Sequence, residues 1–324
     1  MIRNKLRSIF NPNQFQGWNR RKRYFEGWYF KVLNEQETKA FAIIPGIAID
    51  DQGKGQAFIQ VLDGKKQTAQ YHKFGIEEFS PSPDKFNITI QNNSFSLQSF
   101  QLDLPELKGE LHFTNQVPWP NRWYSPGIMG PYSFLPLMEC YHGILSMDHV
   151  LTGHLAVEGE DIDFKNGRGY TEKDWGQSFP SAYIWLQSNH FTQPGISLKV
   201  SVAKIPYLGY SFVGFIAGVW LGDRLVQFTT YNRSVLRKST IDAEKVELVM
   251  ENKKFRLEIL VQREAATILA SPILGLMDGR IEESMNAQIE VNLIDKRSGQ
   301  SIFSDIGRNA GLEVAGKIEE IMIL

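Results

Sequence analysis

Short apolar runs of strand length, separated by turn residues, dominate this chain. Two such runs, 41–49 and 56–62, flank the loop Asp-Asp-Gln-Gly-Lys-Gly, which is typical of a hairpin. In the second half Gly222-Asp223 separates two further runs, and a glycine at the first central position suits a type II′ turn. Short strands at regular spacing are typical of β-sandwiches and β-barrels. We therefore predict an all-β fold. The expected strands are 41–49, 56–62, 86–90, 95–100, 109–113, 153–157, 162–164, 197–203, 212–221, 225–230, 245–250, 255–261 and 287–294.

The chain has 324 residues, which exceeds the size at which one hydrophobic core usually keeps growing. A faint internal echo suggests where to divide it. YFEGWY at 24–29 and YTEKDW at 170–175 share a Tyr, a Glu two residues later and a nearby Trp. The halves so defined are close to the size of one eight-stranded barrel that can hold a small ligand. We predict an N-terminal arm over 1–23, a first barrel over 24–166 and a second over 167–324.

A Pro-rich connection at 117–136 interrupts the first predicted barrel. It is too irregular for a strand or helix, and loops of this length are usually lids, binding loops or linkers. The sequence favours a loop that covers a cavity, because it supplies aromatic cover. The aromatic residues in question are Trp119, Trp123, Tyr124 and Tyr132.

Composition excludes several classes of protein. The net charge of −1 gives no overall attraction to nucleic acid, and 42% hydrophobic with 22% charged residues is ordinary for a soluble globular protein. Cys140 is the single cysteine, which excludes an intramolecular disulfide and fits a reducing, cytoplasmic location. The uncharged run 205–222 contains Pro206 and four glycines, so it favours buried strands over a membrane span.

The N-terminus is basic. Before Glu26 the sequence has no acidic residue, whereas Arg3, Lys5, Arg7 and the run 20–23 are all basic. Such an arm is either solvated or in peripheral contact with anionic lipid headgroups, each charge adding about 1 kcal/mol near a charged surface. No apolar segment of the secretory type follows it.

The segment 169–191 combines acids, indole rings and an imidazole: GYTEKDWGQSFPSAYIWLQSNHF. This mixture suggests charged groups brought up to an apolar cavity. Strand alternation places Glu172 and Asp174 on one face and Lys173 on the other. The same period places His190 opposite the face shared by Tyr183, Trp185, Gln187 and Asn189.

Several further segments resemble the tocopherol cyclase family. They are YFEGWYFKV at 24–32, PGIMG at 126–130, MECYHGILS at 138–146, the Gly-Arg-Gly-Tyr lead-in at 167–170 and, more weakly, AGLEVAG at 310–316. The family is similar to a wider group of two-domain lipocalin-like proteins that includes carotenoid hydratases and fungal pericyclase-type cyclases. The resemblance implies two antiparallel β-barrels packed together, with an apolar pocket for a lipophilic small molecule.

The resemblance also implies a reaction. The family closes a chromanol ring: an alkene of a prenylated hydroquinone is protonated, and the phenol oxygen captures the tertiary cation. The product is an isomer of the substrate, so neither a redox cofactor nor a metal is expected. The chemistry needs an acid, a water-excluding cavity and aromatic faces that stabilise a cation.

Asp174 is the first candidate for the acid, with Glu172 as its alternative or its orienting partner. Each carboxylate could also be an ordinary turn residue paired with Lys173. His190 is a candidate general base or a structural histidine. The predicted substrate-binding residues are Glu26, Trp28, Tyr170, Trp175, Tyr183, Trp185, Gln187, Asn189, Trp123 and His142.

Each of these residues has a structural alternative. The tryptophans could belong to the core, and Glu26 could accept bonds from backbone amides. Glu139, Cys140 and His142 suggest a metal site, but no spaced second cluster completes it, so none is predicted. The leading interpretation is a tocopherol cyclase-like isomerase of the intramolecular lyase type. The alternatives are a non-catalytic isoprenoid carrier and a hydratase or pericyclase acting on another terpenoid.

Overall fold

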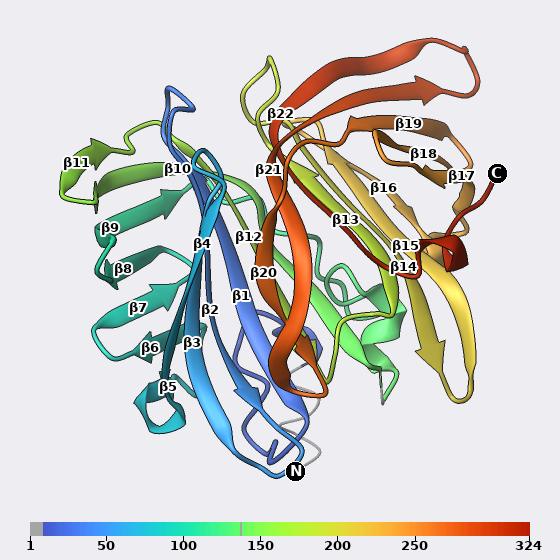
Figure 1. Cartoon of the computed structure of the whole chain (residues 1–324). Coiled ribbons are helices and arrows are strands. Elements are labelled where there is room, and N and C mark those ends of the chain that lie inside the picture. Colours follow the sequence, from blue (N-terminus) through green and yellow to red (C-terminus); the bar gives the residue numbers. More distant parts are fainter. Residues whose placement is uncertain (1–8, 137) are drawn as a thin grey trace. The chain divides into compact units, whose positions relative to one another are not determined.

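The computed structural model describes residues 9–136 and 138–324. After Phe10, the regular elements of this part are β-strands and short 3₁₀ helices (Figure 1). The predicted all-β fold is confirmed. The chain forms two compact units: unit 1 runs to Phe179 and includes Ala270–Arg280, and unit 2 comprises Pro180–Leu269 and Ile281–Leu324.

Unit 1 is built on an antiparallel 12-stranded sheet. The hydrogen-bonded order is β4-β3-β2-β1-β12-β10-β9-β8-β7-β6-β5, and β11 pairs with β10 off this path. β4 runs through the 3₁₀ helix η1 directly into β5, so the two ends of the path are consecutive in sequence. The elements are β1 (Tyr24–Leu33), β2 (Ala40–Ile49), β3 (Gly55–Asp63), β4 (Thr68–Gly75), η1 (Ile76–Glu78), β5 (Phe79–Pro81), β6 (Asn87–Ile90), β7 (Asn93–Ser96), β8 (Ser99–Asp103), β9 (Leu107–Thr114), η2 (Gly130–Phe134), β10 (Cys140–Val157), β11 (Glu160–Asp163) and β12 (Arg168–Gly176).

Unit 2 follows the same plan with a 10-stranded sheet, ordered β16-β15-β14-β13-β22-β21-β19-β18-β17, with β20 paired to β21 off the path. Here β16 continues through η3 into β17. The elements are β13 (Ala182–Ser188), β14 (Ser197–Tyr207), β15 (Tyr210–Trp220), β16 (Leu225–Thr229), η3 (Thr230–Asn232), β17 (Val235–Ile241), β18 (Lys245–Glu251), β19 (Phe255–Gln262), β20 (Thr267–Ile273), β21 (Leu276–Asp295), β22 (Ser301–Gly316) and η4 (Ile318–Glu320). Within each unit the first strand pairs with the last.

This topology corrects the predicted division of the chain. The strand that carries YTEKDW is β12, which does not open the second unit: it closes the first, because it pairs with both β1 and β10. YFEGWY and YTEKDW are antiparallel neighbours, with Glu26 opposite Trp175. The boundary therefore lies at 179/180 instead of 166/167, and residues 270–280 return to unit 1.

Each sheet has one face against a hydrophobic cluster. In unit 1 the cluster includes Trp28 and Phe30 from β1, and in unit 2 it includes Ile184 and Leu186 from β13. Among residues 9–136 and 138–324, no helix is long and apolar enough to cross a membrane.

The predicted N-terminal arm is partly packed. Phe15 is buried in the unit 1 cluster, whereas the basic run 20–23 is exposed. Arg3, Lys5 and Arg7 of the same prediction lie outside the described residues.

Two predicted strands are far too short. The segment 287–294 is part of β21, which has 20 residues. The segment 153–157 is the end of β10, an 18-residue strand that starts at Cys140. Polar residues at 141–142 interrupt the apolar pattern from which a strand is predicted. His142, one of the two, contacts Glu172 and Asp174. In the predicted covering loop, Trp119 is buried, but Trp123 is 80% exposed.

Candidate active site

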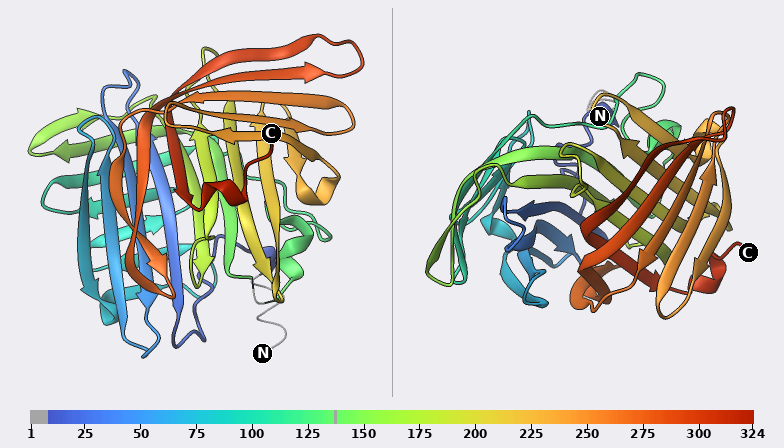
Figure 2. Two further views of the ribbon diagram at one scale, coloured as in Figure 1. Left: turned by 45° about the vertical axis from the view of Figure 1, so that its right-hand side comes forward. Right: turned by 90° about the horizontal axis from the view of Figure 1, so that it is seen from above.

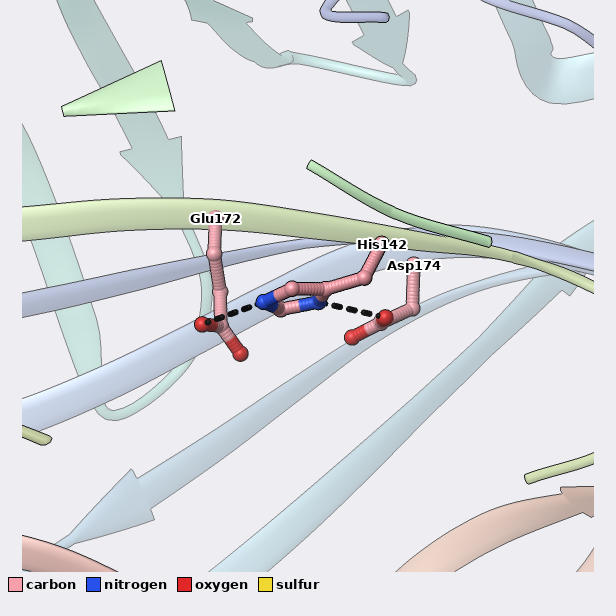
Figure 3. A group of neighbouring side chains, drawn as sticks. All are labelled: His142, Glu172 and Asp174. Atoms are coloured by element: carbon pink, nitrogen blue, oxygen red, sulfur yellow. Dashed lines mark hydrogen bonds and ion pairs between the residues drawn. The ribbon is translucent and has the colours of Figure 1, made fainter. Parts of the chain in front are cut away.

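The acid pair of β12 lies on the face of the unit 1 sheet that points away from the hydrophobic cluster. Glu172 stands between Tyr29 of β1 and Ile144 of β10, and Asp174 stands opposite His142. The shared face of Glu172 and Asp174, predicted from strand alternation, is confirmed. Figure 3 shows the imidazole of His142 lying between the two carboxylates.

The distances define a linear arrangement of acid, imidazole and acid. His142 Nδ1 lies 2.8 Å from Asp174 Oδ1, and His142 Nε2 lies 3.5 Å from Glu172 Oε2. Residues two apart on a strand point the same way at a spacing of roughly 7 Å. A single imidazole fills that gap and contacts both acids. The Glu172 side chain is 4% exposed and that of Asp174 is 25% exposed, so the arrangement has a closed end and an open end.

Two more groups extend the network. The Tyr170 hydroxyl donates a short hydrogen bond to Glu172 Oε2. Burial, reinforced by the charge of Glu172, raises the pKa of Tyr170 well above its usual range, so the phenol stays a donor. At the other end the Cys140 thiol is 3.9 Å from Asp174 Oδ1. Burial and then the charge of Asp174 raise the pKa of Cys140, which keeps it a thiol and disfavours a role as nucleophile.

The three donor groups could also hold a cation. One atom each from His142, Glu172 and Asp174 lies within 4.8 Å of the others. However, the contact of Asp174 with Nδ1 leaves Nε2 and Glu172 as two direct ligands, with Asp174 orienting the ring from outside. Catalytic zinc sites usually have three protein ligands. The donor set therefore fits proton transfer better than a resident metal.

The opposite face of β12 carries a buried ion pair. Lys173 Nζ lies 2.5 Å from Glu26 Oε1, and neither side chain is exposed. The ammonium group also lies 4.8 Å from the Trp28 ring centre and 4.7 Å from that of Trp175, and it donates to the carbonyl of Pro12. Burial lowers the pKa of Lys173 to about 8, although Glu26 opposes this shift.

This face contains three of the predicted substrate-binding residues. Trp28 belongs to the hydrophobic cluster, Trp175 packs against it, and Trp28 stacks on Phe86. Glu26 accepts hydrogen bonds from the backbone amide of Gln16 at 2.9 and 3.0 Å. Glu26, Trp28 and Trp175 are thus separated from the acid pair by the thickness of the sheet. The two tryptophans thus pack in or against the core, and Glu26 accepts bonds from a backbone amide, while their role in substrate binding stays a prediction.

The later aromatic segment belongs to unit 2. Tyr183, Trp185 and Gln187 of β13 share the face that points away from the unit 2 cluster. The Tyr183 hydroxyl donates to Glu313 Oε2 at 2.8 Å. A methyl group at Gly311 would lie 2.5 Å from the Trp185 ring, so the glycine makes room for the indole.

Asn189 and His190 are buried just beyond the end of β13. The predicted base His190 forms a backbone bridge with Arg308 within unit 2. The imidazole that contacts the acids belongs to His142, which the sequence predicts as a substrate-binding residue and not as the base. Trp123, also predicted for the pocket, packs its exposed ring against Tyr124 instead.

Comparisons with known proteins place this geometry in context. Residues 110–316 match the family model described as tocopherol cyclase-like. A chloroplastic tocopherol cyclase from Zea mays is 26% identical over 207 residues, covering 56% of this chain and 40% of the maize protein. A probable chloroplastic tocopherol cyclase from Oryza sativa subsp. japonica is 25% identical over 193 residues, with the same coverage. The matches therefore span less than half the length of these two relatives.

Solved structures share the fold. CghA with Sch210972 superimposes with a TM-score of 0.60 at 12% identity, covering 90% of this chain and 88% of CghA. Kievitone hydratase from Nectria haematococca gives a TM-score of 0.52 at 9% identity, covering 90% of this chain and 89% of the hydratase. At these identities the likeness extends to the fold alone.

Proposed function

This chain belongs to the tocopherol cyclase-like family, and from that premise we propose that it is an isomerase that cyclises a prenylated quinol or a related isoprenoid by proton transfer. The observation that carries the proposal is the His142 imidazole held between Glu172 and Asp174 on a mostly buried sheet face. Such a chain of groups can give a proton at one point of a reaction and take one back at another.

The two carboxylates have different roles in this proposal. Asp174 is the proton donor, because its side chain lies at the open end of the network. Glu172 is the orienting partner, because it is buried and accepts the Tyr170 hydroxyl. The His142 ring, whose Nδ1 lies 2.8 Å from Asp174 Oδ1, stabilises by hydrogen bonding the carboxylate that remains after Asp174 has given up its proton.

The proton balance closes without a cofactor. The Asp174 proton adds to the substrate alkene, and the phenol oxygen bonds to the resulting tertiary cation. The phenol proton then returns to Asp174, directly or through His142, and the product is an isomer of the substrate. The buried setting of Glu172 and His142 in unit 1 supports a lipophilic substrate.

The test is to incubate the protein with a panel of prenylated quinols and to follow ring closure by chromatography. We expect wild type to form a product of unchanged mass, and Asp174→Asn and His142→Asn to lose activity by roughly 10²- to 10⁴-fold. His72→Asn is the matched control, because His72 contacts Glu106 at 2.7 Å elsewhere in unit 1. Equal activity in Asp174→Asn and wild type would contradict the proposed acid.

The same assay separates the alternative functions. A carrier would bind the quinols tightly without converting any of them. A hydratase, suggested by the fold likeness to kievitone hydratase, would form a product heavier by one water. A pericyclase needs no acid, so its activity would survive Asp174→Asn. Addition of a chelator should not change the rate if the cluster transfers protons and holds no metal.

A further inference from the structure

The β14–β15 hairpin of unit 2 extends beyond its own sheet. β13 pairs with β14 only as far as Ala203, and β16 pairs with β15 only from Ile216 onward. The hairpin nevertheless continues, from Lys204 opposite Val213 to Tyr207 opposite Tyr210. At about 3.4 Å per residue, this two-stranded ribbon projects by roughly 14 Å. Figure 2 shows it in yellow, reaching past its neighbouring strands.

The ribbon ends in a tight turn. Leu208 and Gly209 have φ values of 50° and 84°, and positive values at both central positions define a type I′ turn. This turn matches the natural twist of the strands, so the tip is a well-formed hairpin end. Leu208 therefore stands at the outermost point of the ribbon, 70% exposed.

The side chains of the tip are large and apolar. Tyr210 is 84% exposed and Phe212 is 38% exposed. Because paired residues point to the same side, Tyr207, Tyr210, Ile205 and Phe212 share one face of the ribbon. Single exposed apolar residues are common, but a projecting cluster of them usually marks an interaction site. The sequence had predicted buried strands for this run, and the exposed tip departs from that prediction.

The tip also has no charge. No Asp, Glu, Lys or Arg occurs between Ile205 and Gly222. At the base of the ribbon Lys204 is neutralised by Glu320, with Nζ 2.8 Å from Oε1. The tip therefore offers neither attraction nor repulsion to a charged partner, and its polar side-chain groups are the tyrosine hydroxyls and Ser211.

We propose that this hairpin tip inserts into the interfacial region of a lipid bilayer. A narrow convex ribbon buries little area against a rigid protein, where stable interfaces need about 800 Å² from each partner. A fluid bilayer closes around such a ribbon and covers all its sides. Tyrosine and leucine suit this environment, because tyrosine rings sit at the headgroup level while leucine enters the acyl region. The projection is long enough for an interfacial depth of about 5–10 Å.

Vesicle flotation with neutral phosphatidylcholine vesicles in 0.5 M NaCl tests the proposal. These conditions suppress contacts of the basic N-terminal residues with anionic lipid. We expect wild type to float with the vesicles and Leu208→Ser/Tyr210→Ser to bind at least tenfold more weakly. Ile302→Ser/Ile306→Ser is the matched control, because both isoleucines are exposed residues of β22 in the same unit; it should bind like wild type.

A second measurement locates the contact. Tyr210→Trp should show quenching by brominated phosphatidylcholine beyond that of the native tryptophans. Absence of wild-type flotation, or equal flotation of the tip variant, would overturn the proposal. A concentration-dependent dimer that the tip variant abolishes would assign the tip to self-association and would also overturn it. Asp174→Asn should float like wild type, so failure of the proposed isomerase would leave this test unaffected.

Discussion

The two units of this protein share one strand order but differ in the chemistry of their polar faces. In unit 1 the last strand, β12, presents Glu172 and Asp174 to an imidazole from β10. In unit 2 the last strand, β22, presents Glu313, which is opposite Glu283 of β21 and bonded to Tyr183. The corresponding strands thus provide acids in both units, whereas the His142 cluster belongs to unit 1. The shared topology specifies where a site can form, and a few side chains specify what it does.

The largest difference between the units should appear in catalysis. We expect His142→Asn to lower kcat by roughly 10²- to 10⁴-fold, because it removes the imidazole that contacts both carboxylates and can return the proton to Asp174. Glu283→Gln in unit 2 should lower kcat by less than tenfold. Steady-state kinetics with the prenylated quinol that the protein cyclises checks both values of kcat. Comparable losses of kcat in the two variants would contradict the assignment of catalysis to the polar face of the unit 1 sheet.

The next largest effect concerns the buried ion pair of unit 1. Lys173→Met should destabilise the protein by about 3–5 kcal/mol, because Glu26 would remain buried without its cation. Lys173→Met combined with Glu26→Gln should cost less than Lys173→Met alone. Urea denaturation followed by circular dichroism measures both. A double variant as unstable as the single one would show that packing of the lysine stem, and not its charge, is what matters.

A pH effect should also arise in unit 1. Burial lowers the pKa of His149 to about 3, so this ring stays neutral in the folded protein while it gains a proton near pH 6.5 when unfolded. The unfolded state then binds more protons between pH 6.5 and 3, and stability falls as the pH drops through this window, by at most tenfold in the unfolding constant per pH unit. His149→Leu should reduce the slope of stability against pH measured between pH 6.5 and 5. An unchanged slope would assign the acid sensitivity to other groups.

The smallest effects test a feature common to both units. A glycine in the closing strand makes room for a ring: a methyl group at Gly169 would lie 2.2 Å from His149 Nε2, and one at Gly311 would lie 2.5 Å from Trp185. Gly169→Ala and Gly311→Ala should each cost about 1–3 kcal/mol by overpacking. His149→Ala and Trp185→Leu should relieve the respective clash. Thermal melts of the single and double variants give the coupling, and simple additivity would contradict these contacts.

Sequence alone predicted the fold class and the orientation of the acid pair. Both depend on period-two alternation, which is local and needs no knowledge of distant partners. It could not show that β12 belongs to unit 1, because strand pairing across more than a hundred residues leaves no local signal: Glu26 lies opposite Trp175. The similarity of YFEGWY and YTEKDW suggests a repeat, although the two segments are paired neighbours in one sheet.

The absence of a local signal for strand pairing also explains why the sequence favours His190 over His142 as the base. His142 and His190 are both near acids or aromatic residues in sequence, and His190 is the nearer of the two to Glu172 and Asp174 along the chain. Only the pairing of β10 with β12 brings His142 opposite Asp174. Likewise, alternation places Trp28 and Glu26 on a common face but cannot tell that this face is the packed one, with Lys173 between them.

The return of residues 270–280 to unit 1 has a consequence for biosynthesis. The Ala270 amide bonds to Gln60, and the Gly275 amide bonds to the carbonyl of Gln177. A ribosome must therefore translate beyond residue 280 before unit 1 can complete its hydrogen bonds, by which time most of unit 2 has also emerged. N-terminal domains usually finish folding first, but unit 1 cannot do so, because it includes residues 270–280. A nascent chain stalled near residue 200 would lack both of these hydrogen bonds and would hold an unfinished first unit.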